Sequence, residues 1–129
     1  MTKFKYILAI DPSGNFSEGK GITGWCLMND KGDLIETGVI KATTYNRPEE
    51  YWNGHKNMIH HFVEKYKDDM IVVIENFILY KDKAISQSNS QMETCRLIGL
   101  LQWYLWKRNI PYSLQRATDV KHRWSDDLL

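Results

Sequence analysis

The chain has 129 residues, of which 43% are hydrophobic and 26% are charged, and its formal net charge at pH 7 is +1. This length fits one domain with its own core. No apolar run approaches the ~20 residues of a transmembrane helix, and the N-terminal segment lacks the pattern of a signal peptide, so we expect neither. Cys26 and Cys95 show no metal-ligand or disulfide spacing, which indicates free thiols in a reducing cytoplasm.

The charge is distributed unevenly along the chain. Residues 1–80 carry 9 Lys/Arg against 11 Asp/Glu, whereas residues 81–123 carry 8 against 3. A basic second half that faces an acidic site suits a phosphodiester ligand. A solvated positive surface explains the same pattern, so charge alone does not decide between the two.

The first third of the chain contains three strand patterns separated by turn residues. The strands are expected at residues 5–11, 22–28 and 34–42. The first is a buried apolar run that ends on Asp11, and a polar, glycine-bearing loop follows it. The turn at residues 29–33 suits a hairpin with one left-handed residue. We expect these strands to form an antiparallel meander.

A helix is predicted over residues 46–66. Asn46 is a candidate cap, Pro48 stands in the first turn, and two acids follow at the positive end of the helix. Apolar positions recur at offsets of three and four and form one core-facing stripe. The stripe consists of Tyr51, His55, Met58, Ile59, Phe62, Val63 and Tyr66.

The second half of the chain alternates strands and helices. Residues 70–74 form another buried run, which ends on Glu75. After a polar stretch, a second helix runs as far as Trp106 and is apolar nearly all round in its C-terminal half, which indicates deep burial or a dimer interface. A short strand at residues 111–114 follows, and a last helix begins at residues 118–119.

The order of elements predicts an α/β fold in a single domain over residues 1–129. Hairpins pair the first three strands antiparallel, and the strands reached through helical crossovers run parallel to the first. The result is a mixed five-stranded sheet, three antiparallel then two parallel strands, with helices on both faces. Asp11 and Glu75 then end adjacent central strands.

Asp11 and Glu75 are the leading candidates for a functional site. Open α/β sheets place their ligands at the carboxyl ends of strands. Two neighbouring carboxylates repel each other unless a cation lies between them, and an acid beside a buried run rarely serves packing. An Asp before Pro-Ser-Gly is also a common turn former, so it is the pairing with Glu75 that favours a divalent metal site.

Six segments, spread over nearly the whole chain, together carry a family pattern. They are residues 7–13, 23–25, 73–77, 90–99, 109–112 and 120–121. In their order and spacing they resemble the RNase H-like nucleases, most closely the RuvC-type Holliday-junction resolvases of the phage type. The resemblance implies that Asp11 and Glu75 bind Mg²⁺, or Mn²⁺ as a substitute, with two ions per site. It also implies that Lys121 faces the DNA near the scissile phosphate. If a phage encodes the chain, the expected location of the protein is the cytoplasm of the host.

The chain departs from that family at its C-terminal end. The family has two further acids in a C-terminal helix, close to a His-Ala-Xaa-Asp-Ala pattern, and this chain stops at Leu129 before such a helix. We therefore expect either a C-terminally truncated chain or a further metal acid from elsewhere. The candidates for that acid are Asp119, Asp126 and Asp127.

The chemistry of phosphodiester hydrolysis explains why these residue types matter. Two Mg²⁺ ions about 4 Å apart supply a nucleophile from water and stabilise the leaving oxygen. Basic and aromatic side chains would contact the DNA, where phosphate contacts fix register without reading sequence. The candidates are Ser13, Phe77, Tyr80, Lys81, Lys83, Arg96, Arg116, Lys121 and Arg123. A four-way junction, recognised by its shape, suits a homodimer in which each site cuts one strand.

Two further motifs have simpler explanations. His55, His60 and His61 suggest zinc, but His60 and His61 are adjacent and point to different faces of a helix. Gly19-Lys20-Gly21 lacks the spacing of a Walker loop, so no nucleotide cofactor is expected.

Aromatic residues outside the first helix fit more than one role. Phe77 and Tyr80 could stack at a DNA junction, although aromatic side chains after a strand usually belong to the core. Trp103, Tyr104 and Trp106 are expected in the core or at a dimer interface rather than as base-stacking platforms.

The leading hypothesis is a magnesium-dependent, structure-selective endodeoxyribonuclease that resolves four-way (Holliday) or branched DNA. The alternative is a catalytically incomplete RNase H-like domain that binds nucleic acid or acts as a scaffold. Magnesium-dependent cleavage that is lost in Asp11→Asn and Glu75→Gln separates the two. An ATP-handling protein of the actin and hexokinase group also has a first strand that ends in Asp, but 129 residues leave no room for its second domain.

Overall fold

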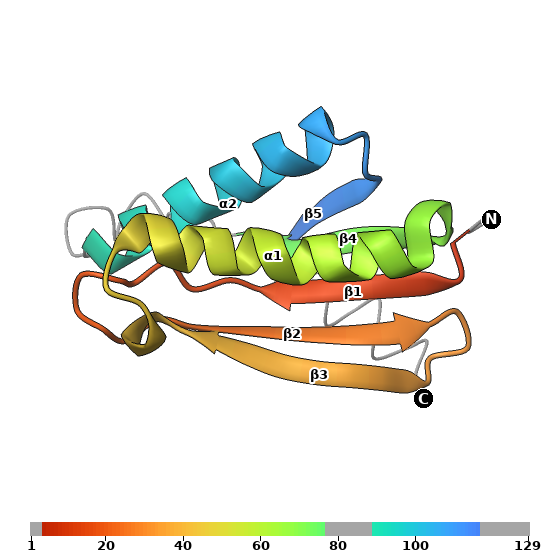
Figure 1. Cartoon of the computed structure of the whole chain (residues 1–129), viewed down its shortest axis with the longest axis horizontal. Helices are drawn as coiled ribbons and strands as arrows, with labels where there is room; N and C mark the ends of the chain where they lie inside the picture. Colours follow the sequence, from red (N-terminus) through yellow and green to blue (C-terminus); the bar gives the residue numbers. More distant parts are fainter. Residues whose placement is uncertain (1–3, 77–88, 117–129) are drawn as a thin grey trace.

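The computed structural model describes residues 4–76 and 89–116. In these residues five strands form one sheet in the order β3-β2-β1-β4-β5, and two long helices pack on it (Figure 1). The strands are β1 (Tyr6–Asp11), β2 (Ile22–Asn29), β3 (Leu34–Lys41), β4 (Met70–Asn76) and β5 (Tyr112–Arg116). The helices are α1 (Pro48–Tyr66) and α2 (Asn89–Lys107), with short 3₁₀ turns η1 (Ala42–Thr44) and η2 (Lys67–Asp69).

The sheet is mixed, as predicted. β1 pairs antiparallel with β2, and β2 pairs antiparallel with β3. β1 pairs in parallel with β4, and β4 pairs in parallel with β5. β1 and β4 lie at the centre of the sheet, because their continuous apolar runs suit strands that are covered on both faces. The predicted fold class, a mixed five-stranded sheet with helices, is confirmed.

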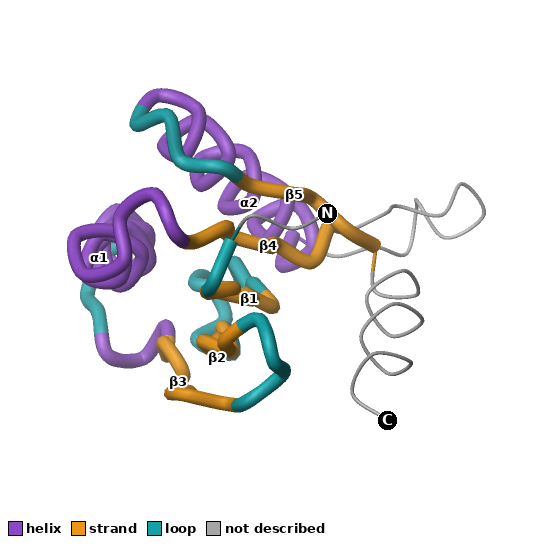
Figure 2. The backbone as a smooth tube through the Cα atoms, turned by 90° about the vertical axis from the view of Figure 1, so that its right-hand side faces the viewer, coloured by secondary structure: helices purple, strands orange, loops and turns teal. Residues whose placement is uncertain are grey.

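Both described long helices cover the same face of the sheet, which Figure 2 shows from its end. One cluster of buried side chains joins this face to α1 and α2. Its members are Leu8, Ile10, Leu27, Ile59, Phe62, Met70, Val72, Ile74, Leu97, Ile98, Leu101, Tyr104, Leu105 and Ile110. The third expected helix lies outside the described residues, so helices on both faces remain a prediction.

The start of α1 corrects one sequence prediction. The N-cap residue is Arg47 and not Asn46, because Pro48 occupies the first turn and favours an extended conformation in the residue before it. The carboxylate of Glu50 then accepts hydrogen bonds from the backbone N–H groups of Arg47, at 3.0 Å, and Asn46, at 3.2 Å. An acid in the first turn therefore provides the cap.

One side of α2 is exposed along its C-terminal half, which excludes the core, one of the two expected places, for two of its tryptophans. Tyr104 is buried, whereas Trp103 and Trp106 are 54% and 66% exposed, so these two tryptophans do not belong to the core. After α2, Asn109 adopts a left-handed conformation (φ 57°) and turns the chain toward β5. Among the described helices, none is long and apolar enough to cross a membrane.

Substitutions of two leucines test the position of the core. Leu8 is fully buried under the helices, whereas Leu34 on the edge strand β3 is 61% exposed. We expect Leu8→Ala to lower the free energy of unfolding by about 2–5 kcal/mol, because the cavity adds to the lost transfer energy. Leu34→Ala should change it by less than about 1 kcal/mol. Urea unfolding of both variants checks this, and equal losses would contradict the assignment of the core.

Candidate functional site

Asp11 is the last residue of β1, and Glu75, the last but one of the neighbouring strand β4, lies at the same level. β1 and β4 are aligned in parallel from the pair Tyr6 and Met70 to the pair Ile10 and Ile74. Continuing this alignment by one residue places Asp11 opposite Glu75. Neighbouring strands lie about 4.8 Å apart, so the backbone brings these two acids side by side. The prediction that they lie on adjacent central strands is confirmed.

Both acids lie on the face of the sheet that is opposite to α1 and α2. Leu8, Ile10, Val72 and Ile74 belong to the core under the helices. Because side chains alternate between faces along a strand, the residues that follow Ile10 and Ile74 lie on the other face. Asp11 is exposed and Glu75 is partly buried. The helix layer therefore serves packing, and the other face carries the carboxylates.

A row of four residues crosses the sheet at this level. Gly24 on β2 pairs with Asp11, and Gln115 on β5 pairs with Glu75. Among the described residues, nothing lies within 4 Å of the position that a Cβ atom on Gly24 would take, so the space beside Asp11 is open there. No sequence pattern indicates a role for Gln115, because its place beside Glu75 depends on the register of β4 and β5.

The loop after Asp11 is fixed to the first turns of α2. The Gly14 N–H donates to Thr94 Oγ1 at 2.9 Å, and the Phe16 and Ser17 N–H groups donate to Glu93 Oε2 at 3.1 and 3.2 Å. A Cβ atom on Gly14 would lie 2.2 Å from the Glu93 carbonyl oxygen, so only glycine permits this approach. The Glu93 carboxylate is thus engaged in positioning the loop.

A buried hydrogen-bond network fixes the backbone of Ser13, two residues after Asp11. The Ser13 N–H donates to Thr23 Oγ1 at 3.0 Å, and the Tyr51 hydroxyl donates to the Ser13 carbonyl oxygen at 2.5 Å. His55 Nε2 lies 2.7 Å from Thr23 Oγ1, and His55 Nδ1 lies 2.7 Å from the Tyr51 carbonyl oxygen. Thr23, Tyr51 and His55 are all fully buried.

These contacts determine which atoms carry protons. The Tyr51 carbonyl oxygen can only accept, so His55 Nδ1 carries a hydrogen, and in the neutral ring Nε2 accepts from the Thr23 hydroxyl. A neutral imidazole satisfies both contacts. Burial lowers the pKa of His55 below its usual 6.5, against the opposing hydrogen bond to the Tyr51 backbone. Both His55 nitrogens are engaged in hydrogen bonds within the network, so His55 is not available as a zinc ligand.

The described residues contain only part of the predicted site. Within residues 4–76 and 89–116, no three or more His, Cys, Asp or Glu side chains gather as a metal site. Arg96 is exposed on α2, and Arg116 is the last residue of β5. The remaining predicted residues lie outside the described part of the chain: Phe77, Tyr80, Lys81, Lys83, Asp119, Lys121, Arg123, Asp126 and Asp127. Their roles remain predictions, as does that of the Ser13 hydroxyl.

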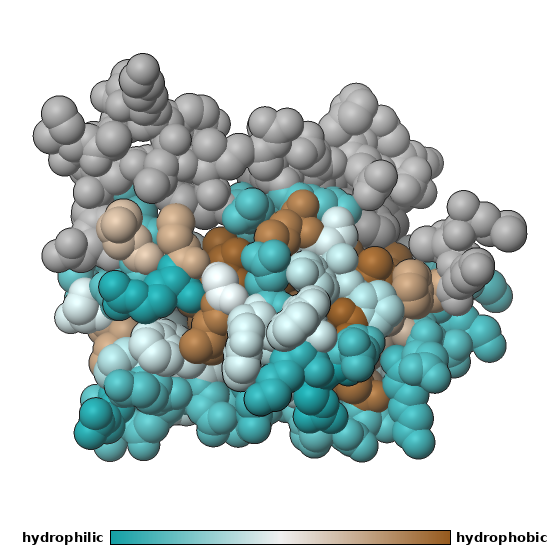
Figure 3. Space-filling model, turned by 90° about the horizontal axis from the view of Figure 1, so that it is seen from above, coloured by the Kyte–Doolittle hydropathy of each residue, from teal (hydrophilic) through white to brown (hydrophobic). Residues whose placement is uncertain are grey.

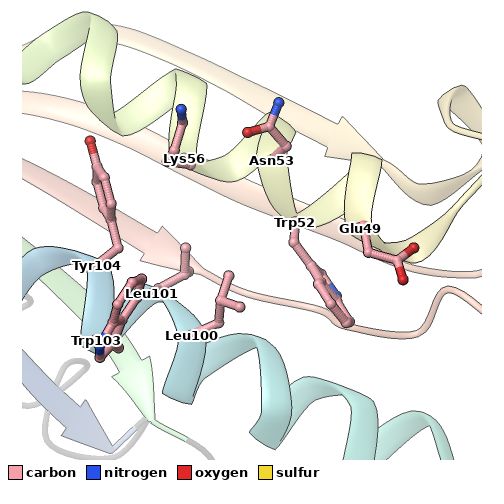
Figure 4. A pocket seen from close by; sticks show the side chains of 8 residues that line it. All are labelled: Glu49, Trp52, Asn53, Lys56, Leu100, Leu101, Trp103 and Tyr104. Atoms are coloured by element: carbon pink, nitrogen blue, oxygen red, sulfur yellow. The ribbon is translucent and has the colours of Figure 1, made fainter.

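An apolar groove of about 200 Å³ lies between α1 and α2 (Figure 4). Trp52 and Lys56 line it from α1, and Leu100, Trp103 and Tyr104 line it from α2. The groove belongs to the helix layer, whereas Asp11 and Glu75 lie on the opposite face of the sheet. It is therefore separate from the carboxylate site.

Comparisons with known proteins bear on the fold. No protein-family model and no curated protein matches the chain in sequence. A solved structure of Thermus thermophilus RuvC is similar, with a TM-score of 0.66, 14% identity, and coverage of 91% of this chain and 67% of that chain. A structure of T. thermophilus RuvC in complex with a Holliday junction substrate is also similar, with a TM-score of 0.65 and 12% identity. That match covers 91% of this chain and 68% of the RuvC chain. The fold is RuvC-like.

The pH dependence of stability tests the His55 network. The imidazole titrates near 6.5 when unfolded and lower when folded, so below pH 6.5 the unfolded state binds more protons. Stability should therefore be complete above about pH 6.5 and fall as the solution becomes more acidic. We expect His55→Gln to be less stable than the parent at pH 7.5 but to lose less stability between pH 7.5 and 5.5.

Urea unfolding at the two pH values measures this effect. His61→Gln is the matched control, because His61 is exposed on the same helix. That variant should keep the acid sensitivity of the parent chain. An equal loss on acidification in the parent and in His55→Gln would show that His55 is not the titrating group.

Proposed function

We propose that this chain is a metal-dependent, structure-selective endodeoxyribonuclease that resolves four-way or branched DNA by hydrolysis of phosphodiester bonds. One observation carries the proposal: Asp11 and Glu75 lie at aligned positions near the carboxyl ends of adjacent parallel strands in a RuvC-like fold. Two carboxylates placed so closely, with one of them exposed, suit a divalent cation far better than they suit packing.

The donor set fits Mg²⁺, with Mn²⁺ as a substitute. Mg²⁺ prefers oxygen ligands, keeps several of its waters, and is usually held by one or two carboxylates together with substrate phosphate. Asp11 and Glu75 would hold the metal, which when bound activates water and stabilises charge on the leaving oxygen. The family resemblance implies two ions per site, and any further acid would come from outside the described residues.

The chain's own residues then position the acids and leave room for DNA. The network of Thr23, Tyr51 and His55 fixes the backbone directly after β1, and the first turns of α2 hold the same loop from its other side. Such support keeps a carboxylate in a defined place when phosphate approaches. Gly24 leaves open space beside Asp11 among the described residues, on the face that carries the acids.

Branched DNA as the partner is supported by two observations. One of the similar structures is described as RuvC in complex with a Holliday junction substrate. In this chain, residues 81–123 carry 8 Lys/Arg against 3 Asp/Glu, an excess that suits contacts with phosphates. In the proposed reaction Lys121 lies near the scissile phosphate, as the resemblance implies.

Replacing either acid should remove cleavage and retain binding. We expect Asp11→Asn and Glu75→Gln each to reduce Mg²⁺-dependent cleavage of a synthetic four-way junction by more than about 100-fold. Even residues that only support a metal ligand contribute 10- to 100-fold, so a direct ligand should contribute more. Both variants should still bind the junction in a gel-shift assay, because phosphate contacts provide most of the affinity.

Asp68→Asn is the matched control, because Asp68 is exposed near the opposite end of β4 and the change in charge is the same. It should cleave at the parent rate. Cleavage that persists in EDTA would contradict a metal mechanism. A parent chain that binds junctions in Mg²⁺ and Mn²⁺ without cutting them would instead identify a nucleic-acid-binding domain.

We also propose that two copies associate through α2. A stripe on this helix repeats at intervals of four and three residues, and all of its members are exposed. It consists of Met92, Arg96, Gly99, Trp103 and Trp106. This spacing is typical of a helix–helix interface, and Trp103 continues the stripe into the groove between α1 and α2. Figure 3, which views the molecule from above, shows apolar side chains that reach the surface among polar ones.

Trp106→Glu should weaken this association. A buried tryptophan at an interface contributes about 2 kcal/mol or more, so the dimer dissociation constant should rise by roughly 30-fold. Sedimentation velocity over a range of concentrations measures the change, and Leu34→Glu on β3 serves as a control for adding an acid at an exposed apolar position. A parent chain that stays monomeric throughout, or an equal effect of the control, would exclude an α2 interface.

A further inference from the structure

Gln115 has a buried polar atom without a hydrogen-bond partner in the described structure. The side chain is 8% exposed, and its Nε2 donates to Ser113 Oγ at 3.4 Å. The amide oxygen Oε1 is fully enclosed, and no described residue donates to it. Buried amide oxygens nearly always have a partner, so such an atom calls for an explanation.

The position of this oxygen connects it to the carboxylate site. Gln115 pairs with Glu75 in the parallel register of β4 and β5, so the two side chains lie on the same face of the sheet. Glu75 in turn lies beside Asp11. One level of the sheet therefore presents two carboxylates and one amide oxygen on three adjacent strands, β1, β4 and β5.

The chemistry of this row determines what the oxygen can bind. With the amide oriented so that its nitrogen donates to Ser113, the oxygen that is left over can only accept a hydrogen bond or coordinate a cation. An anion would be repelled by the oxygen and by both carboxylates. A hard divalent cation takes carboxylate and amide oxygens together, and a neutral ligand adds a donor without adding repulsion between like charges.

We propose that Gln115 Oε1 is a third, uncharged oxygen ligand of the cation that Asp11 and Glu75 hold. This inference rests on the proposed function, since it adds a ligand to the same metal site. It explains why a side chain with a long polar end is buried at a strand position that an apolar residue would fill more easily. An acceptor without a partner in the metal-free protein is satisfied when the cation binds.

Mn²⁺ binding to the full chain, followed by electron paramagnetic resonance or calorimetry, tests this role without relying on activity. We expect Gln115→Leu to lower the Mn²⁺ affinity by about tenfold or more. Gln115→Glu should bind Mn²⁺ at least as tightly as the parent, because it offers an oxygen at the same place. Gln102→Leu is the matched control: Gln102 donates to Tyr112 on the helix side of the sheet and should not affect the affinity.

Thermal unfolding without metal separates a ligand from a merely structural glutamine. As a ligand, Gln115 contributes an unsatisfied acceptor to the metal-free protein, so Gln115→Leu should melt at the parent temperature or above it. A structural amide would give the opposite result, with a lower melting temperature and an unchanged Mn²⁺ affinity. That outcome would overturn the inference.

The variants of the acids distinguish failure of this inference from failure of the proposed function. If Asp11→Asn and Glu75→Gln lose Mn²⁺ binding while Gln115→Leu keeps it, the inference about Gln115 is wrong, and its oxygen binds only a water molecule. The proposed metal site of Asp11 and Glu75 is then still supported. If Asp11→Asn and Glu75→Gln bind Mn²⁺ as the parent does, the proposed metal site itself is wrong, and with it the role of Gln115.

Discussion

The parallel ladder between β1 and β4 is the constraint on which the site depends. It aligns Tyr6 with Met70 through Ile10 with Ile74, and this alignment brings Asp11 beside Glu75. A slip of one residue would move one strand's apolar side chains to the other face of the sheet. The core therefore specifies the register, and the register places the acids.

The free energy of core packing is larger than the repulsion between Asp11 and Glu75, so the core can hold these two like charges together. Full burial of a large aliphatic side chain stabilises the fold by about 1.5–3 kcal/mol, and Leu8, Ile10, Val72 and Ile74 are all buried under the helices. Two carboxylates at the spacing of neighbouring strands, about 5 Å, repel each other by on the order of 1–3 kcal/mol near a protein surface. Packing exceeds this repulsion several-fold, and a bound cation would turn the repulsion into attraction. The helix layer thus supplies the free energy that keeps the opposite face ready for a ligand.

Much of this arrangement could be predicted from sequence. The runs before Asp11 and Glu75 are apolar without interruption, so they identify central strands and their ends, and the stripe of α1 identifies its buried face. The sequence suggests Asn46 as the cap of α1, whereas Arg47, the residue before the first-turn proline, takes that place. The exposure of Trp103 and Trp106 could not be foreseen, because a helix that is apolar all round does not reveal which side meets the sheet.

The supporting contacts of the site were beyond sequence reasoning for a physical reason. Thr23, Tyr51 and Ser13 meet only after β1, β2 and α1 have packed, and Glu93 meets the loop after β1 across nearly 80 positions of the chain. The apolar stripe of α1 predicts that His55 is buried, yet nothing local in the sequence shows that both of its nitrogens are engaged. Such contacts depend on tertiary geometry and not on pattern. The role of Gln115 also depends on tertiary geometry, because only the pairing of β5 with β4 places it beside Glu75.

The central claim is that Asp11 and Glu75 share a cation. A crystal soaked in Mn²⁺ and measured at a wavelength where manganese scatters anomalously tests it most directly. The account predicts an anomalous peak between the two carboxylates, within ligand distance of both. A peak bound to only one of these acids, or none near either at saturating Mn²⁺, would contradict it.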